Sequence, residues 1–481
     1  MASAGCASQA APQVLDHLHP CASTEGPVDA YCGGLDVWEN RDTRAGRRIT
    51  LNLVVLPSVS ADVRPDPVFF LAGGPGQGAA QLAQQIQVLF RRVQRNRDIV
   101  LVDQRGTGRS NPLDCKSSGE TLADLTESDD AQIAKLKTCL AGLKGDVRLY
   151  TTNIAMDDLD DVRAHLGYDR VNLYGGSYGT RAALVYLRRH GAHVRSIVLD
   201  GVAPMDMRLP LYAARDAQRS LDALLRDCEG DAACRAAFPG LSARVRTLVA
   251  RLDAEPVRQR VVHPRTGASE ETVVTGRLVA SILFGALYSP LTSSIVPSLV
   301  SQAERHDFQG LLALAFAGET TTDNMSLGMQ LSVICSEDAG RYTPADLARE
   351  TSGSVFGAHL MVGQVKACEF WPRGEVSADY YAPVVSDVPA LVLSGDLDPV
   401  TPPTWGAEVV RHLRNGVHYT AAATGHGVVA TACGSRLVSD FIERGRADGL
   451  DAGCLSTLRR PGFFLTPAGP EPTPVRGAEA P

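Results

Sequence analysis

The 481-residue chain lacks several features that would assign it to a simple class of protein. It has no uninterrupted apolar run of about 18 residues, so no segment is typical of a membrane span. It has no long basic run, and its formal net charge of -7 is mildly acidic, which gives nucleic-acid binding no support. Its cysteines form no Cys-x-x-Cys pair and no pattern interleaved with histidine, so no zinc site is indicated.

The chain does contain 11 cysteines, an unusual number for an intracellular protein. Ten of the 11 form couples that are neighbours in sequence: Cys21 with Cys32, Cys115 with Cys139, Cys228 with Cys234, Cys335 with Cys368, and Cys433 with Cys454. Up to five disulfides in a secreted or periplasmic protein are the simpler interpretation, and buried free thiols are the alternative. The pairing is suggested by proximity alone, because spacing does not determine connectivity.

Cys6 is left without a neighbour. The sequence Ser-Ala-Gly-Cys at 3–6 is typical of the end of a bacterial lipoprotein cleavage site, yet only five residues precede the cysteine and they include no apolar stretch. Two interpretations stay open. Cys6 is the acylated residue of a lipid anchor if the natural start lies upstream. Otherwise it is a single unpaired thiol near the N-terminus.

The most informative segment is Gly-Gly-Ser-Tyr-Gly at 175–179. It lies between a short apolar run at 171–174 and a helical pattern at 180–189, which predicts a strand, a sharp turn and a helix with Ser177 at the tip. Such a turn strains the serine backbone and requires small residues two positions to either side. Gly175 and Gly179 satisfy that requirement, so Ser177 is the candidate nucleophile.

An oxyanion hole is expected ahead of this turn. The apolar run at 68–71 ends in Ala-Gly-Gly-Pro-Gly, a loop whose backbone N–H groups can face a developing negative charge. We assign one donor to Gly74, with Gly73 as its rival, and the other to Tyr178, the residue after the nucleophile. An ordinary turn at the end of a strand is the alternative for this loop.

The acid and the base are expected after the turn. The apolar run at 389–394 leads into Gly-Asp-Leu-Asp-Pro, in which Asp398 is favoured over Asp396, whose alternative is a turn-forming role. His426 lies between two glycines at the end of a second short strand and is the predicted base. His412 and His418 are assigned to packing or to the surface. Ser177 would attack, His426 would carry the proton, and Asp398 would orient the imidazole.

These motifs together resemble the proline iminopeptidase and tripeptidyl aminopeptidase branch of the α/β-hydrolases. The resemblance extends over roughly residues 20–455 and rests on five segments, at 73–76, 103–110, 175–179, 395–399 and 425–427. The segment Asp-Gln-Arg-Gly-Thr-Gly-Arg-Ser at 103–110 is the most specific of them. Many relatives carry histidine before the glycine loop where this chain has Ala72, which weakens any side-chain role at that position.

Asp103 and Arg105 in this specific segment follow the apolar run at 99–102. They could clamp the neighbouring glycine loop through charge-assisted hydrogen bonds. A purely structural role, with no contact to substrate, is the favoured alternative.

The order of elements predicts an α/β fold, with a mostly parallel sheet of the α/β-hydrolase type and a helical cap insertion. We expect the core in two parts, 20–202 and 386–460, with the cap between them at 203–385. An antiparallel pair of strands, at 35–39 and 49–56, would begin the sheet. The segment 466–481, rich in Pro, Gly, Ala and Glu, is expected to be disordered.

The resemblance places substrate selection in the cap. An enzyme that acts at a free N-terminus must recognise an ammonium group, and buried carboxylates can do this. Glu337 and Asp338, which follow an apolar run and adjoin Cys335, are the candidates for substrate binding, with a salt bridge to Arg341 as the alternative.

The sequence therefore predicts a secreted or periplasmic serine exopeptidase that needs neither a metal nor an organic cofactor. Its substrate would be a peptide with a free N-terminus, cleaved through an acyl-enzyme. A carboxylester hydrolase with the same triad is the alternative, because only the cap distinguishes the two. A binding protein that keeps the fold without catalysis is disfavoured by the intact triad, and an aspartate nucleophile is excluded if the turn at Ser177 is assigned correctly.

Overall fold

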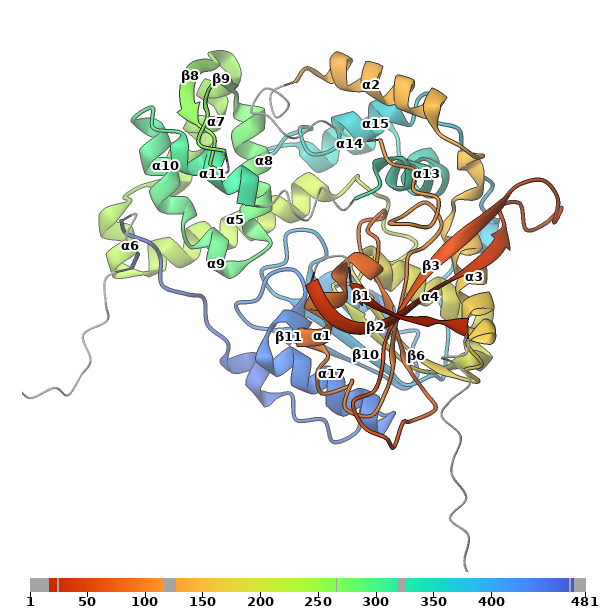
Figure 1. The fold of residues 1–481 in the computed structure, drawn as a ribbon. Coiled ribbons are helices and arrows are strands. Elements are labelled where there is room, and N and C mark those ends of the chain that lie inside the picture. The colour runs from red at the N-terminus through yellow and green to blue at the C-terminus, as the bar shows by residue number, and fades with distance from the viewer. Residues whose placement is uncertain are drawn as a thin grey trace, which may run out of the picture.

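The computed structural model describes residues 17–23, 26–115, 127–264, 266–317, 325–466 and 469–470. At its centre lies a nine-stranded sheet in the order β1-β2-β3-β5-β4-β6-β7-β10-β11 (Figure 1). Its strands are β1 (His19–Ser23), β2 (Gly26–Trp38), β3 (Arg48–Leu56), β4 (Val68–Leu71), β5 (Ile99–Val102), β6 (Val171–Gly176), β7 (Val194–Asp200), β10 (Ala390–Gly395) and β11 (Gly416–Ala421).

The sheet has an antiparallel edge and a parallel body. β1, β2 and β3 pair antiparallel, and β3 also pairs antiparallel with β5. From β5 through β4, β6, β7 and β10 to β11 every pairing is parallel. The predicted antiparallel start and parallel continuation are therefore confirmed, while β1 was not predicted. The carboxyl ends of the parallel strands meet at one edge of the sheet, where open α/β sheets bind their ligands.

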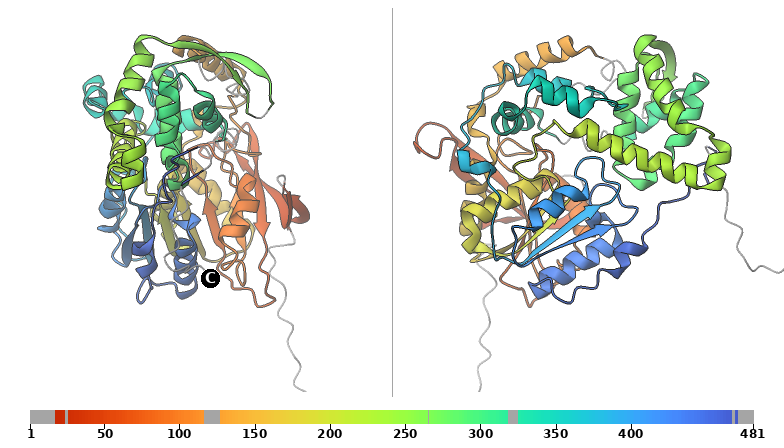
Figure 2. Two further views of the ribbon diagram at one scale, coloured as in Figure 1. Left: turned by 90° about the vertical axis from the view of Figure 1, so that its left-hand side faces the viewer. Right: turned by 180° about the vertical axis from the view of Figure 1, so that it is seen from behind.

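Helices cover both faces of the sheet (Figures 1 and 2). They are α1 (Ala83–Leu89), α3 (Thr152–His165), α4 (Tyr178–His190), α16 (Pro403–Val410) and α17 (Ala432–Arg444), with α2 (Asp129–Gly142) further out. Neighbouring strand residues point to opposite faces. Phe69 accordingly joins the core that contains α3 and α4, and Phe70 joins the core that contains α1 and α17.

Between β7 and β10 the chain is mostly helical. It forms α5 (Ala213–Gly230), α6 (Ala232–Ala237), α7 (Leu241–Ala254), α8 (Gly276–Leu287), α9 (Pro290–Ser293), α10 (Val296–Glu304), α11 (Gln309–Ala317), α13 (Leu327–Glu337), α14 (Pro344–Thr351) and α15 (Val362–Ala367). It also contains a hairpin that the sequence analysis did not predict, β8 (Val257–Val262) with β9 (Ser269–Val274).

This inserted segment divides into two parts. Helices α5, α7, α8, α10 and α11 and the hairpin enclose a hydrophobic core of their own, visible as the separate helical group in Figure 1. Helix α13 instead contributes Leu331, Val333 and Ile334 to the core beside α3 and α4. Trp371, 2% exposed, packs there as well and donates its indole N–H to Ser332 Oγ at 3.1 Å.

All five cysteine couples form disulfides: Cys21–Cys32, Cys115–Cys139, Cys228–Cys234, Cys335–Cys368 and Cys433–Cys454. The predicted pairing is confirmed, and it indicates a protein that folds in an oxidising compartment. Cys6 and most of the segment 466–481 lie outside the described residues.

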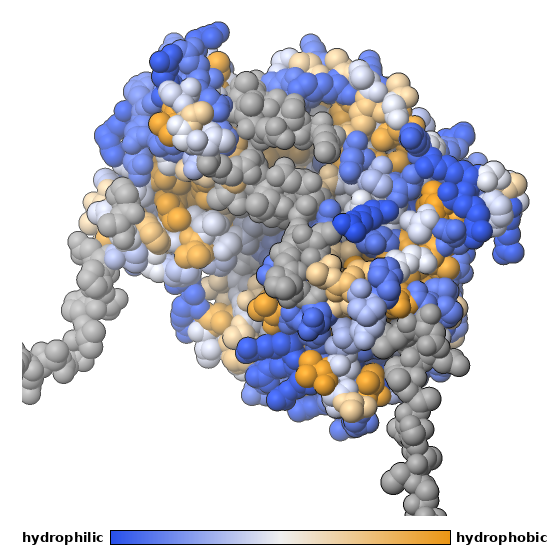
Figure 3. All heavy atoms as spheres, viewed as in Figure 1, coloured by the Kyte–Doolittle hydropathy of each residue, from blue (hydrophilic) through white to orange (hydrophobic). Residues whose placement is uncertain are grey.

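The surface is mixed in character. On the face shown in Figure 3, apolar residues lie in several groups separated by hydrophilic ones. Within the described ranges, no helix combines the length and the apolar composition that crossing a bilayer requires.

Candidate active site

Ser177 lies at the tip of the turn between β6 and α4. Its backbone has φ 58° and ψ −127°, a conformation that L-residues rarely adopt and that costs about 1–3 kcal/mol. The predicted demand for small neighbours is visible in the packing. A Cβ at Gly175 would lie 2.3 Å from the carbonyl oxygen of Gly179, and one at Gly179 would lie 2.1 Å from that of Leu71. Any larger residue at either position would push the turn apart.

His426 and Asp398 form a hydrogen-bonded pair on loops that follow β11 and β10. The distance between His426 Nδ1 and Asp398 Oδ2 is 2.7 Å. Asp398 is fully buried, and the His426 side chain is 14% exposed. Two backbone N–H groups, of Val400 and Thr401, donate to Asp398 Oδ1 at 2.8 Å each. The carboxylate is therefore held in one orientation, with its other oxygen toward the imidazole.

The two ionisable groups of this pair stabilise each other's charged forms. Burial alone would raise the pKa of Asp398, but the charge of His426, its hydrogen bond and the two backbone N–H donors outweigh burial and lower it. Burial alone would lower the pKa of His426, but Asp398, and to a smaller extent Asp200, outweigh burial and raise it. Such a histidine suits a base that must carry a proton during a reaction.

The end of β7 links the histidine loop to the serine turn. Asp200, whose backbone oxygen accepts the N–H of Ser177 at 3.0 Å, pairs with Gly176 across the sheet. The carboxylate of Asp200 accepts the N–H groups of Val428 and Val429 at 2.8 Å each, just after His426. A Cβ placed on the next residue, Gly201, would lie 3.1 Å from His426 Cε1. His426 thus lies beside the strand that neighbours the one carrying Ser177.

The residues considered as alternatives for the acid and the base have other partners. Asp396 accepts the N–H of Thr424 at 3.2 Å, so it braces the histidine loop rather than the imidazole. His418 is on β11, with its Nε2 3.0 Å from Ser394 Oγ. His412 follows α16, and its ring lies 3.9 Å from the carboxylate of Glu408.

Of the residues considered as oxyanion donors, Gly73 lies beside Ser177 and Tyr178 follows it in the chain. A Cβ at Gly73 would lie 3.2 Å from the Cβ of Ser177, so the glycine loop passes directly beside the nucleophile. Tyr178 is the first residue of α4, where backbone N–H groups have no partner within the helix. In the described part of the chain, the N–H groups of Gly73, Gly74 and Tyr178 have no hydrogen-bond acceptor. The tyrosine ring itself is buried, with its hydroxyl 2.7 Å from Thr152 Oγ1.

Two points of the inserted segment touch this site. The backbone oxygen of Tyr288 accepts the N–H of His426 at 2.9 Å, and the two rings meet edge to face with centroids 5.3 Å apart. Tyr288 is 38% exposed. On the other side, Ser326 donates its N–H to the carbonyl of Gly76 at 2.9 Å. The inserted segment therefore borders both the base and the glycine loop.

Glu337 and Asp338 belong to a buried ionic network. Their exposed fractions are 1% and 0%, and the guanidinium of Arg181 reaches them at 3.4 and 2.8 Å. Glu337 also accepts the N–H of Thr152 at 2.7 Å and the hydroxyl of Tyr380 at 2.5 Å. Arg181 lies one helical turn after Ser177, so the network is close to the site. The carboxylates face protein partners, and a substrate amine reaches them only if the inserted segment moves.

Asp338 is the less satisfied of these two carboxylates. Its Oδ1 has no hydrogen-bond partner in the described structure, and Arg341, the alternative partner proposed from the sequence, is 3.8 Å away. Burial raises the pKa of Asp338 to about 7, although Arg181 opposes the shift.

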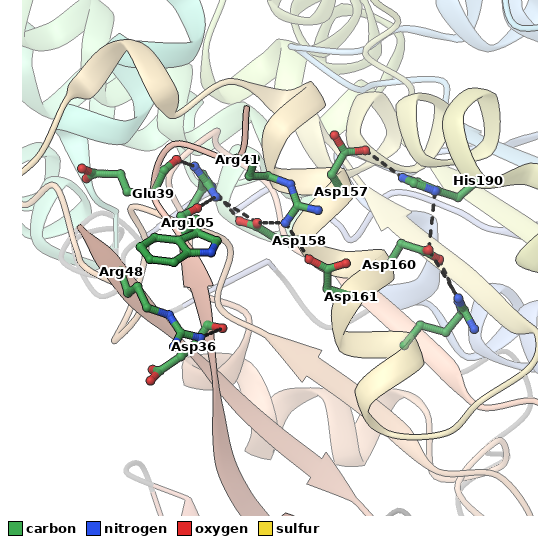
Figure 4. A network of polar contacts seen from close by, with 12 residues as sticks. Asp36, Glu39, Arg41, Arg48, Arg105, Asp157, Asp158, Asp160, Asp161 and His190 are labelled. Atoms are coloured by element: carbon green, nitrogen blue, oxygen red, sulfur yellow. Dashed lines mark hydrogen bonds and ion pairs between the residues drawn. The ribbon is translucent and has the colours of Figure 1, made fainter. Parts of the chain in front are cut away.

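Asp103 and Arg105 have structural partners. Asp103 accepts the N–H groups of Ala80 and Arg109 at 2.9 and 3.0 Å. It thereby holds the segment that follows the glycine loop. Arg105, fully buried, binds both oxygens of Asp158, at 2.6 and 2.9 Å (Figure 4). Its guanidinium also binds the backbone oxygen of Glu39 at 2.8 Å. These contacts support the structural interpretation of this segment.

Thr401 was not identified from the sequence, and it contacts both members of the ionic pair. Its hydroxyl donates to Asp398 Oδ2 at 2.8 Å and lies 3.2 Å from His426 Nδ1. We expect Thr401→Val to lower kcat/KM about 10- to 100-fold, the usual worth of a hydrogen bond to a charged group. The acid limb of the pH profile should also move to higher pH, because a carboxylate without this donor stabilises the imidazolium more strongly.

The control for this prediction is Thr401→Ser, which retains the hydroxyl and should keep nearly full activity. Kinetics between pH 5 and 9 measure both variants. Equal activity of the valine and serine variants would show that the hydroxyl has no positioning role.

Comparisons with known proteins show what the chain is similar to. A family profile described as alpha/beta hydrolase fold matches residues 66–258, and one described as TAP-like protein matches residues 353–454. The serine protease Hip1 of Mycobacterium tuberculosis is 26% identical over 473 residues, covering 90% of each chain. The proline iminopeptidase of Neisseria gonorrhoeae is 30% identical over 138 residues, 28% of this chain and 32% of its own length.

Solved structures include a proline iminopeptidase from Mycobacterium smegmatis. It is 16% identical, with a TM-score of 0.37, and the match covers 86% of this chain and 98% of that one. An esterase from Exiguobacterium antarcticum is 14% identical with the same TM-score, 0.37, over 82% and 96%.

The sheet topology and the profile matches define a serine hydrolase with the α/β-hydrolase fold. Its further similarities are to TAP-like proteins, over residues 353–454, and to proline iminopeptidases, over 28% of the chain. The resemblance inferred from the sequence is confirmed.

Proposed function

We propose that this protein is a serine exopeptidase that releases one residue or a short peptide from a free N-terminus. The observation that carries the proposal is the hydrogen-bonded pair of His426 and Asp398 beside the strained turn at Ser177. The match to a serine protease over 90% of both chains supports peptide as the substrate. The partial match to proline iminopeptidases supports cleavage next to the N-terminus.

In the proposed mechanism, Ser177 Oγ attacks the scissile carbonyl while His426 Nε2 accepts its proton. Backbone N–H groups of Gly74 and Tyr178 stabilise the oxyanion. The imidazolium then protonates the leaving amine, which departs and leaves an ester on Ser177. Water, deprotonated by the same histidine, hydrolyses the ester. Asp398 keeps the imidazole in one tautomer throughout, and no metal or cofactor takes part.

We propose that the inserted segment, residues 203–385, acts as a cap over the site. Selection for a free amine is assigned to this cap. Tyr288 and Ser326 border the base and the glycine loop, as a cap over the site requires. Glu337 and Asp338 remain our candidates for recognising the ammonium group. Arg181, which binds both, lies one helical turn after Ser177, and the cap must shift for a substrate amine to reach the carboxylates.

The test compares chromogenic peptides with a free and with an acetylated N-terminus, alongside short acyl esters. We expect the free peptides to have a kcat/KM at least 100-fold above that of the acetylated ones, because an unpaired buried carboxylate penalises the blocked substrate. Asp338→Asn should reduce this ratio through KM for the free peptides and leave ester hydrolysis unchanged. Strong cleavage of esters alone would make the protein a carboxylester hydrolase, and equal cleavage of free and blocked peptides would remove amine recognition.

We further propose that the protein works outside the cytoplasm, secreted or in the periplasm, because its five disulfides require oxidising conditions. A lipid anchor at Cys6 is the finer form of this proposal. Mass spectrometry of the protein isolated from its native cells, with and without Cys6→Ser, tests it.

A further inference from the structure

A cluster of histidine and aspartate lies at the end of α4 opposite Ser177. His190 is the last residue of α4, His193 ends the short helix η5 (Gly191–His193), and Asp160 lies on the neighbouring helix α3. One ligand atom from each of the three residues lies within 4.8 Å of the others. His193 Nδ1 is 2.8 Å from Asp160 Oδ1, and His190 Nδ1 is 3.6 Å from Asp160 Oδ2. The three side chains are only partly buried.

These distances match the requirements of a transition-metal ion. Zinc binds histidine nitrogen and carboxylate oxygen at about 2.0–2.2 Å, so tetrahedral ligand atoms lie about 3.3 Å apart. The 3.6 Å between His190 Nδ1 and Asp160 Oδ2 is close to that value, whereas the 2.8 Å from His193 Nδ1 is a hydrogen-bond distance to the other oxygen, Oδ1. Two imidazoles with one carboxylate are typical of zinc, cobalt and nickel sites, whereas calcium and magnesium prefer oxygen ligands alone. Solvent can supply a fourth ligand, because the His193 side chain is 36% exposed.

The ring of His190 already has the partner that a metal-binding histidine needs. Its Nε2 lies 2.9 Å from Asp157 Oδ1, so this carboxylate fixes the ring and leaves Nδ1 toward Asp160. Figure 4 shows the imidazole between the two aspartates. Metal-bound histidines commonly donate their second nitrogen to a carboxylate in this way, which orients the ring and makes the other nitrogen a better ligand. A bidentate contact with Arg189 keeps Asp157 in place.

Asp160 is held in a similar manner. Arg163 Nε and the Tyr186 hydroxyl donate to its Oδ1 at 2.7 and 2.8 Å. Its Oδ2 has longer contacts, to Arg163 at 3.3 Å and to His190 Nδ1 at 3.6 Å. Oδ2 is thus the oxygen available to a metal. Oδ1 keeps Arg163 and Tyr186 as donors, while His193 Nδ1, now 2.8 Å from Oδ1, turns from it to bind the metal. The cluster also lies at the carboxyl end of α4, where the helix dipole favours a cation.

We propose that His190, His193 and Asp160 form a site for a divalent transition-metal ion of the zinc, cobalt and nickel class, oriented by Asp157. The site joins α3, α4 and η5 on the outside of the sheet. It is structural, because the 13 residues of α4 separate it from Ser177 by about 20 Å.

The test is a titration of the tag-free, full-length, metal-stripped protein with Co²⁺, followed by its d–d absorption, and with Zn²⁺, followed by calorimetry and by Tm. We expect one saturable site, a visible tetrahedral cobalt band and a higher Tm with zinc. His193→Ala should weaken binding at least tenfold. Asp157→Asn, which removes only the partner of His190, should weaken it about 10- to 100-fold.

His412→Ala is the matched control, since that histidine lies after α16 and pairs with Glu408; it should bind Co²⁺ as the unmodified protein does. Absence of saturable binding would overturn the proposal and leave the cluster as ion pairs only. Binding that survives both His193→Ala and Asp157→Asn would overturn it too, because the metal would then sit elsewhere. Hydrolysis of the substrate by the zinc-loaded and the metal-stripped protein should be equal, and a dependence on zinc would contradict the structural role.

Discussion

Replacing Ser177 by alanine is expected to lower kcat by about 10⁴-fold or more while leaving the fold intact. The hydroxyl is the only group at this turn that can form the acyl-enzyme, and alanine fits the same strained backbone, with φ 58°. A fluorophosphonate probe should label the unmodified protein and fail to label the variant. Steady-state kinetics on the best peptide substrate measure the loss, and circular dichroism verifies folding.

The matched control is Ser456→Ala, an exposed serine whose hydroxyl binds the carbonyl of Gly453 at 2.8 Å. It should retain full activity and full labelling. Ser177→Ala combined with Asp398→Asn should be little worse than Ser177→Ala alone, because residues that act as a unit are strongly non-additive. Retention of more than about 1% of the activity in Ser177→Ala would place the nucleophile elsewhere.

The parts of the site that the sequence predicts well are those governed by local constraints. The turn at Ser177 needs small residues at fixed positions, and the contacts at Gly175 and Gly179 show the reason. Asp398 and His426 follow apolar strands whose carboxyl ends must meet at one edge of a parallel sheet. Their proximity therefore follows from the strand order, although 28 residues separate them along the chain.

The parts that the sequence did not predict depend on long-range contacts. Asp200 is the last residue of β7, but its bonds to Val428 and Val429 span 228 and 229 residues. In the sequence Arg181 is one residue of a helical pattern, and no local feature indicates that it binds Asp338, 157 residues away. Thr401 could have been suspected, because a threonine three residues after an aspartate often bonds its carboxylate in a turn.

The hairpin of β8 and β9 was missed for a different reason. Its first strand has the burial pattern of a surface ribbon, with only Val261 buried and charged residues between the apolar ones. Such a strand has little hydrophobic periodicity to distinguish it from the helices around it. The size and the helical character of the inserted segment were predicted. Its division into two packing groups was not, because it depends on which of its helices pack against α3 and α4.

Arg181→Met is expected to destabilise the protein by about 3–5 kcal/mol, the cost of removing one partner from a buried ionic network. Arg181 is fully buried, and it is the cation that Glu337 and Asp338 share at 3.4 and 2.8 Å. Methionine fills much of the volume but leaves two buried carboxylates without their cation. Chemical denaturation followed by tryptophan fluorescence measures the loss at several pH values.

The pH dependence of this loss separates electrostatics from packing. In the variant, Asp338 loses the cation that opposes the effect of burial on its pKa, so its folded-state pKa rises further above the unfolded value. Stability therefore falls as the pH rises from about 4 through that folded-state pKa. The deficit should therefore be larger at pH 8 than at pH 5.5, and adding Asp338→Asn to Arg181→Met should recover part of it. Arg411→Met is the control: its ion pair with Glu408 is at the surface, with Arg411 68% exposed, and should change stability by no more than about 0.5 kcal/mol. A deficit that is equal at both pH values would mean that the arginine matters for its shape. Asp338 would then be neutral and unable to attract a substrate amine.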